Sequence, residues 1–178
     1  MSSTDAANKA TNLLKKEGIE KLPVPVEAIA RNLGAEIVYE PFQGDVSGML
    51  VRRDDGHSII GVNSTHSNTR QRFTVAHEIA HLLLHKGKPT FVDSFVRLNL
   101  RNGDSTQEEM EANAFAAELL MPHGFVHAQI EDLTQKYPSM ARGELQQRLA
   151  KSFKVSAEAM GYRLKNLGIF GPLDFDPN

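Results

Sequence analysis

Two histidines four residues apart, His77 and His81, lie in the segment of the chain with the strongest helix signal. Together with Glu78 they form an H-E-x-x-H pattern inside a helix expected over residues 70–85. Side chains four apart share one helix face, so both imidazoles can reach a single metal ion, and Glu78 can take a proton from water there. The fold must therefore bring further ligands to this face.

The helical wheel supports a buried position for this helix. Five polar side chains fall within one arc of about 100°, and the rest of the wheel is mainly Phe, Val, Ala, Ile and Leu; the arc holds Thr74, His77, Glu78, His81 and His85. A surface helix would show a broad charged face, so we expect the polar stripe to face a cavity. A histidine pair satisfied by hydrogen bonds alone is the alternative, but it would leave Glu78 buried without a cation.

His85 does not fit a third-histidine pattern. The longer motif H-E-x-x-H-x-x-G-x-x-H needs glycine where Leu84 stands and histidine where Gly87 stands. We therefore exclude His85 as a ligand and interpret it as a cation near a helix C-terminus, with a place at the edge of the cleft as the less favoured alternative.

The third ligand must be His, Asp or Glu, because the chain has no cysteine and a catalytic zinc site normally has three protein ligands. A capping box at residues 105–108 opens a second helix that runs to Met121-Pro122. Glu109 and Asn113 share an apolar face of this helix and need a polar partner there. We predict Glu109 as the third ligand and Asn113 as a residue that hydrogen-bonds a ligating side chain. Gln107, Glu111 and Glu118 cluster on another side and are interpreted as a solvated stripe.

The remaining segments predict an α+β fold: a small antiparallel sheet packed on helices that include the metal helix and the glutamate helix. Helices are expected over residues 6–17 and 26–33, and strands over 35–42, 47–53 and 57–63, with residues 95–100 as a possible short strand. The Asp54-Asp55-Gly56 turn predicts a hairpin. We divide the chain into a zincin-like core (1–124), an all-helical C-terminal unit (125–170) and a tail (171–178).

The C-terminal unit is basic although the whole chain has a formal net charge of −2. Residues 135–166 contain seven basic and two acidic side chains, and their spacing has a helix-turn-helix rhythm with a turn near residues 154–156. Such a unit could contact DNA or a protein partner. We favour a helical cap on the core, because few base-reading side chains (Arg163, Lys165 and Asn166) lie on its last helix.

Two segments together resemble the ImmA/IrrE family of metallo-endopeptidases: R-F-T-V-A-H-E-I-A-H-L-L-L-H and E-M-E-A-N-A-F-A-A-E-L-L-M-P. The resemblance covers residues 25–125. It implies a gluzincin-like core with Zn²⁺ on His77, His81 and Glu109. It also implies a cytoplasmic bacterial protein that cleaves a helix-turn-helix repressor.

Together these features predict a zinc-dependent intracellular endopeptidase with Glu78 as general base, acting on a repressor or antitoxin. The alternatives are a non-catalytic regulator of the same fold that binds such a partner, or a DNA-binding protein. No apolar run of about 18 residues or secretory signal is visible, so we expect a cytoplasmic protein. Candidate oxyanion donors are Tyr39, His66, Arg70, Arg72 and His123, and an extended substrate segment could dock on a sheet edge.

Overall fold

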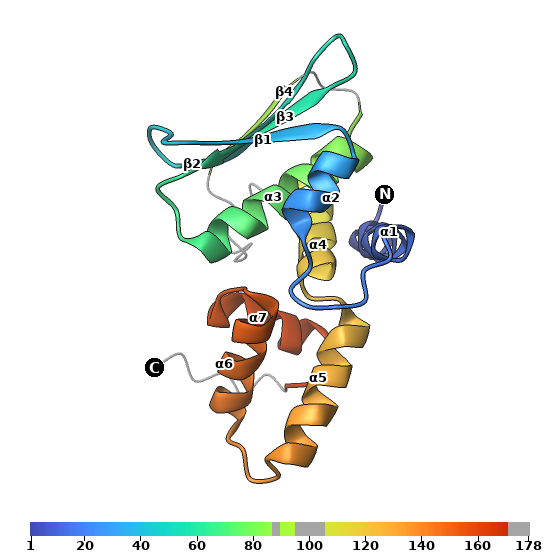
Figure 1. Cartoon of the computed structure of the whole chain (residues 1–178), viewed down its shortest axis with the longest axis vertical. Coiled ribbons are helices and arrows are strands. Elements are labelled where there is room, and N and C mark those ends of the chain that lie inside the picture. The colour runs from blue at the N-terminus through green and yellow to red at the C-terminus, as the bar shows by residue number, and fades with distance from the viewer. Residues whose placement is uncertain (87–89, 95–105, 171–178) are drawn as a thin grey trace.

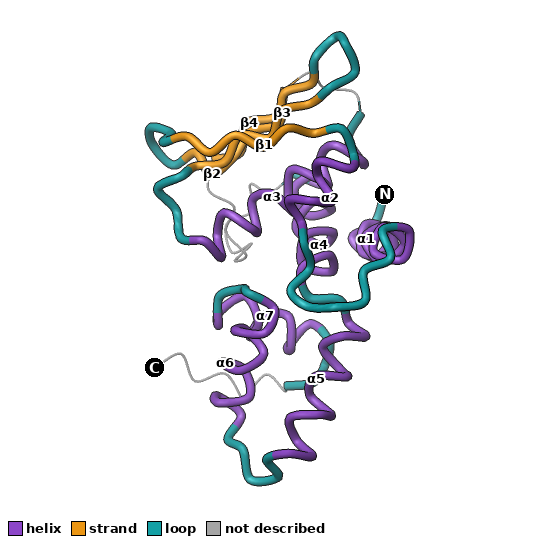
Figure 2. The backbone as a smooth tube through the Cα atoms, viewed as in Figure 1, coloured by secondary structure: helices purple, strands orange, loops and turns teal. Residues whose placement is uncertain are grey.

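The computed structural model describes residues 1–86, 90–94 and 106–170, and it has the predicted α+β fold. In Figures 1 and 2 one small sheet forms a layer at one end of the molecule, and the helices lie on one side of it. No helix in these residues is both long and apolar enough to cross a membrane.

The sheet has four strands in the order β1-β3-β2-β4. Their bounds are Ala35–Glu40 for β1, Val46–Arg52 for β2, Ser58–Asn63 for β3 and Thr90–Ser94 for β4. The predicted hairpin is confirmed, since β2 and β3 pair antiparallel, and β4 adds antiparallel to β2.

One pairing differs from the antiparallel sheet that the sequence suggested. β1 lies beside β3 and runs parallel to it, so the sheet is mixed. Alternation of apolar and polar residues predicts a strand but not the direction of its neighbour, because the same pattern serves both pairings. β4 begins before the predicted strand at residues 95–100, which lie outside the described residues. The sheet edges are therefore β1 and β4, and the two hairpin strands are both interior.

Helix α3 (Asn68–Leu84) carries the H-E-x-x-H pattern and packs under the sheet. Residues 73–81 are all buried, as the wheel predicted. The end of α3 is held from the sheet: Arg52 Nη2 on β2 donates to the carbonyl oxygens of His81 (2.7 Å) and His85 (3.0 Å). The His81 carbonyl also accepts from the backbone N–H of the C-cap residue His85 (3.2 Å), so Arg52 adds a side-chain donor where the helix ends.

Two helices pack on α3, and a third packs on one of them. Helix α2 (Val26–Asn32) packs on α3 and β1, α4 (Gln107–Leu120) packs on α3, and α1 (Ser3–Lys16) packs on α4. Helix α1 is amphipathic: a capping box between Ser2 and Asp5 starts it, and its apolar face is buried. Figure 1 shows α1 lying beside α4, so segments about 100 residues apart in the sequence share one core.

The chain turns at Met121-Pro122 into three further helices, α5 (His123–Lys136), α6 (Arg142–Phe153) and α7 (Ala157–Asn166). The predicted turn is present, because Lys154 adopts a left-handed conformation (φ 52°) and Ser156 caps α7. Arg163 on α7 pairs with buried Glu118 of α4 and donates through Nε to the Met121 carbonyl at 2.9 Å. This contact ties the last helix to α4.

Candidate metal site

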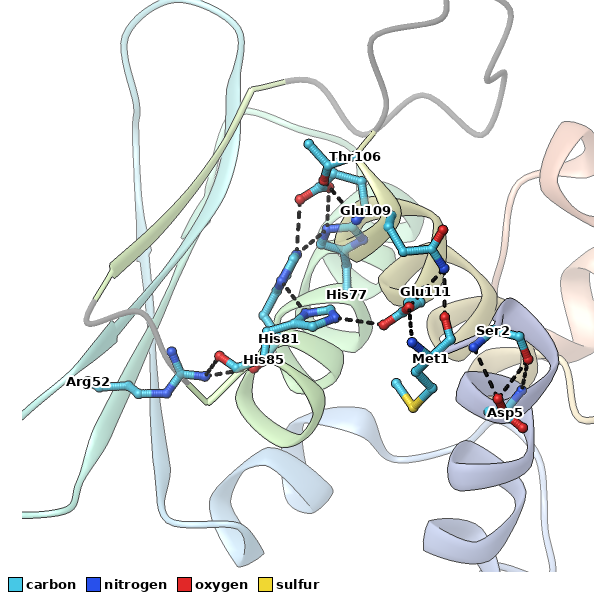
Figure 3. Close-up of polar contacts among 11 residues, drawn as sticks. Met1, Ser2, Asp5, Arg52, His77, His81, His85, Thr106, Glu109 and Glu111 are labelled. Carbon is cyan, nitrogen blue, oxygen red and sulfur yellow. Dashed lines mark hydrogen bonds and ion pairs between the residues drawn. The ribbon is translucent and has the colours of Figure 1, made fainter.

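The two histidines of α3 and Glu109 of α4 point toward one another (Figure 3). The Nε2 atoms of His77 and His81 are 3.0 Å apart. Glu109 Oε2 lies 3.2 Å from His77 Nε2, and Glu109 Oε1 lies 3.4 Å from His81 Nε2. Both histidines are completely buried, whereas the Glu109 side chain is 32% exposed. The cluster is thus enclosed by α3 and opens at the carboxylate.

These three side chains fit a metal ion by spacing and by donor type. The three candidate ligand atoms lie within 4.8 Å of one another. In a tetrahedral zinc site with bonds of about 2.0–2.1 Å, neighbouring ligand atoms are about 3.3 Å apart. The observed contacts of 3.0–3.4 Å lie around that value. Two imidazoles and one carboxylate are also a donor set found in catalytic zinc sites.

Asn113 lies where the sequence placed it, one turn after Glu109. Its Oδ1 is 3.1 Å from His77 Nδ1. An amide oxygen is only an acceptor, so His77 donates from Nδ1 and leaves Nε2 free for a cation. The contact fixes the tautomer that ligation through Nε2 needs.

The start of α4 positions Glu109, although the cap differs from the prediction by one residue. Thr106 is the N-cap, and its Oγ1 accepts from the backbone N–H of Glu109 at 3.3 Å. Glu109 therefore occupies the third helical position, where a capping-box glutamate would turn back to the cap. Its carboxylate instead faces the two histidines.

His85 is the C-cap residue of α3, near the helix C-terminus as predicted, but it is buried against other side chains. It is 8% exposed, and its Nδ1 lies 2.9 Å from His81 Nδ1. Its Nε2 lies 3.1 Å from Glu111 Oε2 on α4. The histidine side chains of α3 thus form a continuous row that ends on a carboxylate of α4.

The predicted solvated stripe was wrong for two of its three members. Glu111 and Glu118 are each 4% exposed, and only Gln107 is exposed. The wheel placed them correctly on one face, but α1 packs over that face and takes water away from it. Thr11 of α1 donates to Glu118 Oε1 at 3.1 Å. A single helix cannot reveal which partner will cover its polar side.

The environment of Glu111 favours its charged form. Gln107 Nε2 donates to Glu111 Oε1 at 2.9 Å, and the Met1 amine lies 3.2 Å from the same oxygen. The hydrogen bond from Gln107, supported by those from His85 and the amine, lowers the pKa of Glu111 to about 2 against the opposing effect of burial. Sequence reasoning missed this residue, although a glutamine four positions earlier was a visible signal.

Glu78 lies on the side of α3 that faces β2. It is fully buried, and a Cβ atom built on Gly48 would lie 2.7 Å from Glu78 Oε1. Strand β2 can pass this close only because residue 48 has no side chain. Gly48 therefore sets the space available to the Glu78 carboxylate.

Comparison with known proteins agrees with this geometry. The family model of peptidases described as the IrrE N-terminal-like domain matches residues 30–165. The chain belongs to this family. The match includes all the site residues above and extends to α7. The resemblance to ImmA/IrrE proteins is thereby confirmed.

A solved structure described as a Mycobacterium tuberculosis transcriptional regulator shares the fold of this IrrE-like chain. The two are 16% identical with a TM-score of 0.58, and the match covers 91% of this chain and 46% of that one. The chain thus spans about half the length of that regulator. No curated protein matches the chain.

Several candidate oxyanion donors of this IrrE-like chain have other partners in the structure. Arg72 Nη2 donates to the Val24 carbonyl (2.8 Å), and His123 Nδ1 lies 2.9 Å from Glu118 Oε1. Arg70 Nη2 donates to Ser47 Oγ at 2.9 Å, next to Gly48 on β2. Arg70 thus contacts β2, the strand that borders Glu78.

Proposed function

We propose that this chain is a zinc-dependent intracellular endopeptidase that hydrolyses a peptide bond in a specific protein partner. The observation that carries the proposal is the cluster of His77, His81 and Glu109, with their ligand atoms within 4.8 Å. Membership of a peptidase family supports the same reaction class. His77, His81 and Glu109 would hold the ion, and Asn113 would orient His77.

Glu78 is the proposed general base. A bound zinc ion would supply Lewis acidity that polarises a carbonyl and lowers the pKa of water. Glu78 would take the proton from the attacking water and then deliver it to the leaving amine. Its complete burial beside Gly48 keeps competing water away from the carboxylate and limits its movement. The exposed side of Glu109 offers a route by which a peptide reaches the cluster.

The proposed partner is a DNA-binding transcriptional repressor or antitoxin. Its basis is the family, together with the shared fold of a protein described as a transcriptional regulator. Such a partner would meet the peptidase in the cytoplasm. The partner would add an extended segment at a free sheet edge, which makes β1 or β4 the docking strand, because β2 and β3 are paired on both sides.

For helices α5–α7 we propose a cap that faces the protein partner. Several of the seven basic side chains in residues 135–166 have partners within the chain, and three of them form the following ion pairs. They are Lys136 with Asp132 (2.8 Å), Arg148 with Glu144 (2.8 Å) and Arg163 with Glu118. Arg163 was one of the few candidate base readers, and its pairing weakens the case for DNA binding. A gel shift with salt-dependent binding of the purified chain would contradict this assignment.

The decisive experiment combines metal analysis with one conservative variant. Wild type and Glu78→Gln are purified, assayed for zinc, and incubated with the helix-turn-helix repressor encoded by a neighbouring gene, with and without a chelator. We expect both proteins to bind about one zinc per chain, but only the wild type to cleave. Chelator should stop cleavage, and added zinc should restore it.

Two results would reject the enzymatic proposal in different ways. If the wild type binds no zinc, the metal site is wrong. If Glu78→Gln retains the full effect on the repressor in cells, the chain acts by binding its partner as a non-catalytic regulator.

A further inference from the structure

We propose that His85 and Glu111 are positioning residues for the metal ligand His81, acting through a directed row of hydrogen bonds. This inference rests on the proposed zinc site. The row runs from His81 Nδ1 to His85 Nδ1 (2.9 Å) and from His85 Nε2 to Glu111 Oε2 (3.1 Å), as Figure 3 shows.

The chemistry of the groups fixes the direction of each bond. A histidine that ligates through Nε2 carries its proton on Nδ1, so His81 donates to His85. Two N–H groups cannot point at each other across 2.9 Å, so His85 Nδ1 accepts and its proton sits on Nε2. That proton is donated to Glu111, whose carboxylate only accepts. Each nitrogen and oxygen atom in the row is then either a hydrogen-bond donor or an acceptor, with no conflict.

The two histidine ligands are thus supported differently. His77 donates to a neutral amide, Asn113, whereas His81 is linked through His85 to a charged carboxylate. The negative charge of the carboxylate polarises the N–H bonds of the row toward Glu111. This raises the electron density on the His81 ring and makes its Nε2 a stronger metal ligand. The Glu111 charge is itself stabilised by Gln107, which holds its other oxygen at 2.9 Å. The row should therefore raise zinc affinity and hold the His81 ring in place.

Helix α4 provides a matched control in Glu118. Both glutamates are 4% exposed, and each contacts a histidine, His85 at 3.1 Å for Glu111 and His123 at 2.9 Å for Glu118. Glu118 also pairs with Arg163. The contacts of Glu118 are with Thr11, His123 and Arg163, and none of these is a candidate metal ligand. A Gln substitution at either site removes one buried carboxylate charge from the same helix, but only Glu111→Gln alters the row.

The test measures zinc dissociation constants by chelator competition in full-length variants, with circular dichroism to confirm folding. Visible absorption of the Co²⁺-loaded proteins provides a second readout. We expect Glu111→Gln to weaken zinc binding about tenfold and His85→Leu about 10- to 100-fold. His85→Gln should stay within about threefold of the wild type, because its amide can accept from His81 and donate to Glu111. Glu118→Gln should leave zinc affinity and the Co²⁺ spectrum unchanged.

Three outcomes would overturn the inference while leaving the zinc site intact. His85→Leu could bind zinc like the wild type, His85→Gln could be as weak as His85→Leu, or the two Gln variants of α4 could weaken binding alike. In the last two cases the residues would matter for packing rather than as a hydrogen-bonded row. If His85→Leu does not fold, the comparison of Glu111→Gln with Glu118→Gln decides alone. Failure of the wild type to bind zinc would instead reject the proposed function itself.

Discussion

Strand β2 passes close to α3 at Gly48, and an alanine there would meet two side chains of the helix that carries the histidines. The added Cβ atom would lie 2.3 Å from Thr74 Cγ2 and 2.7 Å from Glu78 Oε1. Both distances are shorter than real Cβ contacts, so at least one neighbour must move. The Thr74 side chain is β-branched and 1% exposed, which leaves it little room. The Glu78 carboxylate ends a longer chain and should be displaced first.

The size of the effect follows from these contacts. Overpacking a buried site costs about 1–3 kcal/mol. For a chain of this length that corresponds to a fall in Tm of about 2–12 °C. Displacing a reacting group by about 1 Å can cost about 100-fold in rate, so we expect a loss of that order in kcat for Gly48→Ala. Zinc affinity should stay within about threefold, because the close contacts of the new Cβ atom do not include His77, His81 or Glu109.

Thermal unfolding, zinc competition and repressor cleavage would be measured on three variants. Gly61→Ala on β3 is the control, because the nearest atoms to its Cβ atom would be those of Met49 (Cγ at 2.8 Å) and Phe42 (Cζ at 3.0 Å). Gly61→Ala should lose stability but keep kcat. Adding Thr74→Ser to Gly48→Ala removes the methyl group at 2.3 Å and should restore stability without restoring cleavage. The reasoning is refuted if Gly48→Ala cleaves at the wild-type rate, or if Gly61→Ala loses kcat equally.

Three further predictions concern the support of the site. Arg52→Met removes the Nη2 group that donates to the carbonyls of both His81 and His85. It should lower the free energy of unfolding by about 1–3 kcal/mol, and an unchanged urea midpoint would contradict this prediction. Thr106→Ala removes the cap of α4 and should lower the free energy of unfolding by about 0.5–2 kcal/mol. It should also weaken zinc binding, since Glu109 lies in the first turn; an unchanged zinc affinity would show that the cap does not position Glu109. Zinc at about 100 times its dissociation constant should stabilise the folded protein by about 2.7 kcal/mol and raise Tm by about 5–11 °C; a Tm that ignores both zinc and chelator would argue against the site.

Much of the fold was predictable because its signals are local. The helix over residues 68–84 showed its burial in the composition of its wheel, and the hairpin showed its turn at residues 54–56. The parallel partner of β1 and the edge strand β4 were not predictable, because both depend on contacts between distant segments. Local periodicity carries no information about the direction of a neighbouring strand.

In the candidate site, too, features within one helix were predictable and contacts between helices were not. The H-E-x-x-H spacing and the shared face of Glu109 and Asn113 are properties of single helices, and the structure brings these residues together. His85 and Glu111 are on different helices, so their contact depends on how α3 packs against α4. The position of His85 near the helix C-terminus was predicted, but its contact with Glu111 and the burial of Glu111 were not.

Glu111 and Glu118 were both predicted to be solvated, and both are buried for the same reason. Glu111 and Glu118 lie seven residues apart, two turns along the same face, and α1 covers that face. Buried carboxylates need hydrogen-bond or charged partners, and the two glutamates have partners on different helices. His85 of α3 contacts Glu111, and Arg163 of α7 contacts Glu118. One helix thus links the candidate metal site to the C-terminal helices through two charges. Glu118 and Arg163 are not members of the hydrogen-bonded row from His81 to Glu111, so the Glu118 variant separates packing from support of the ligand.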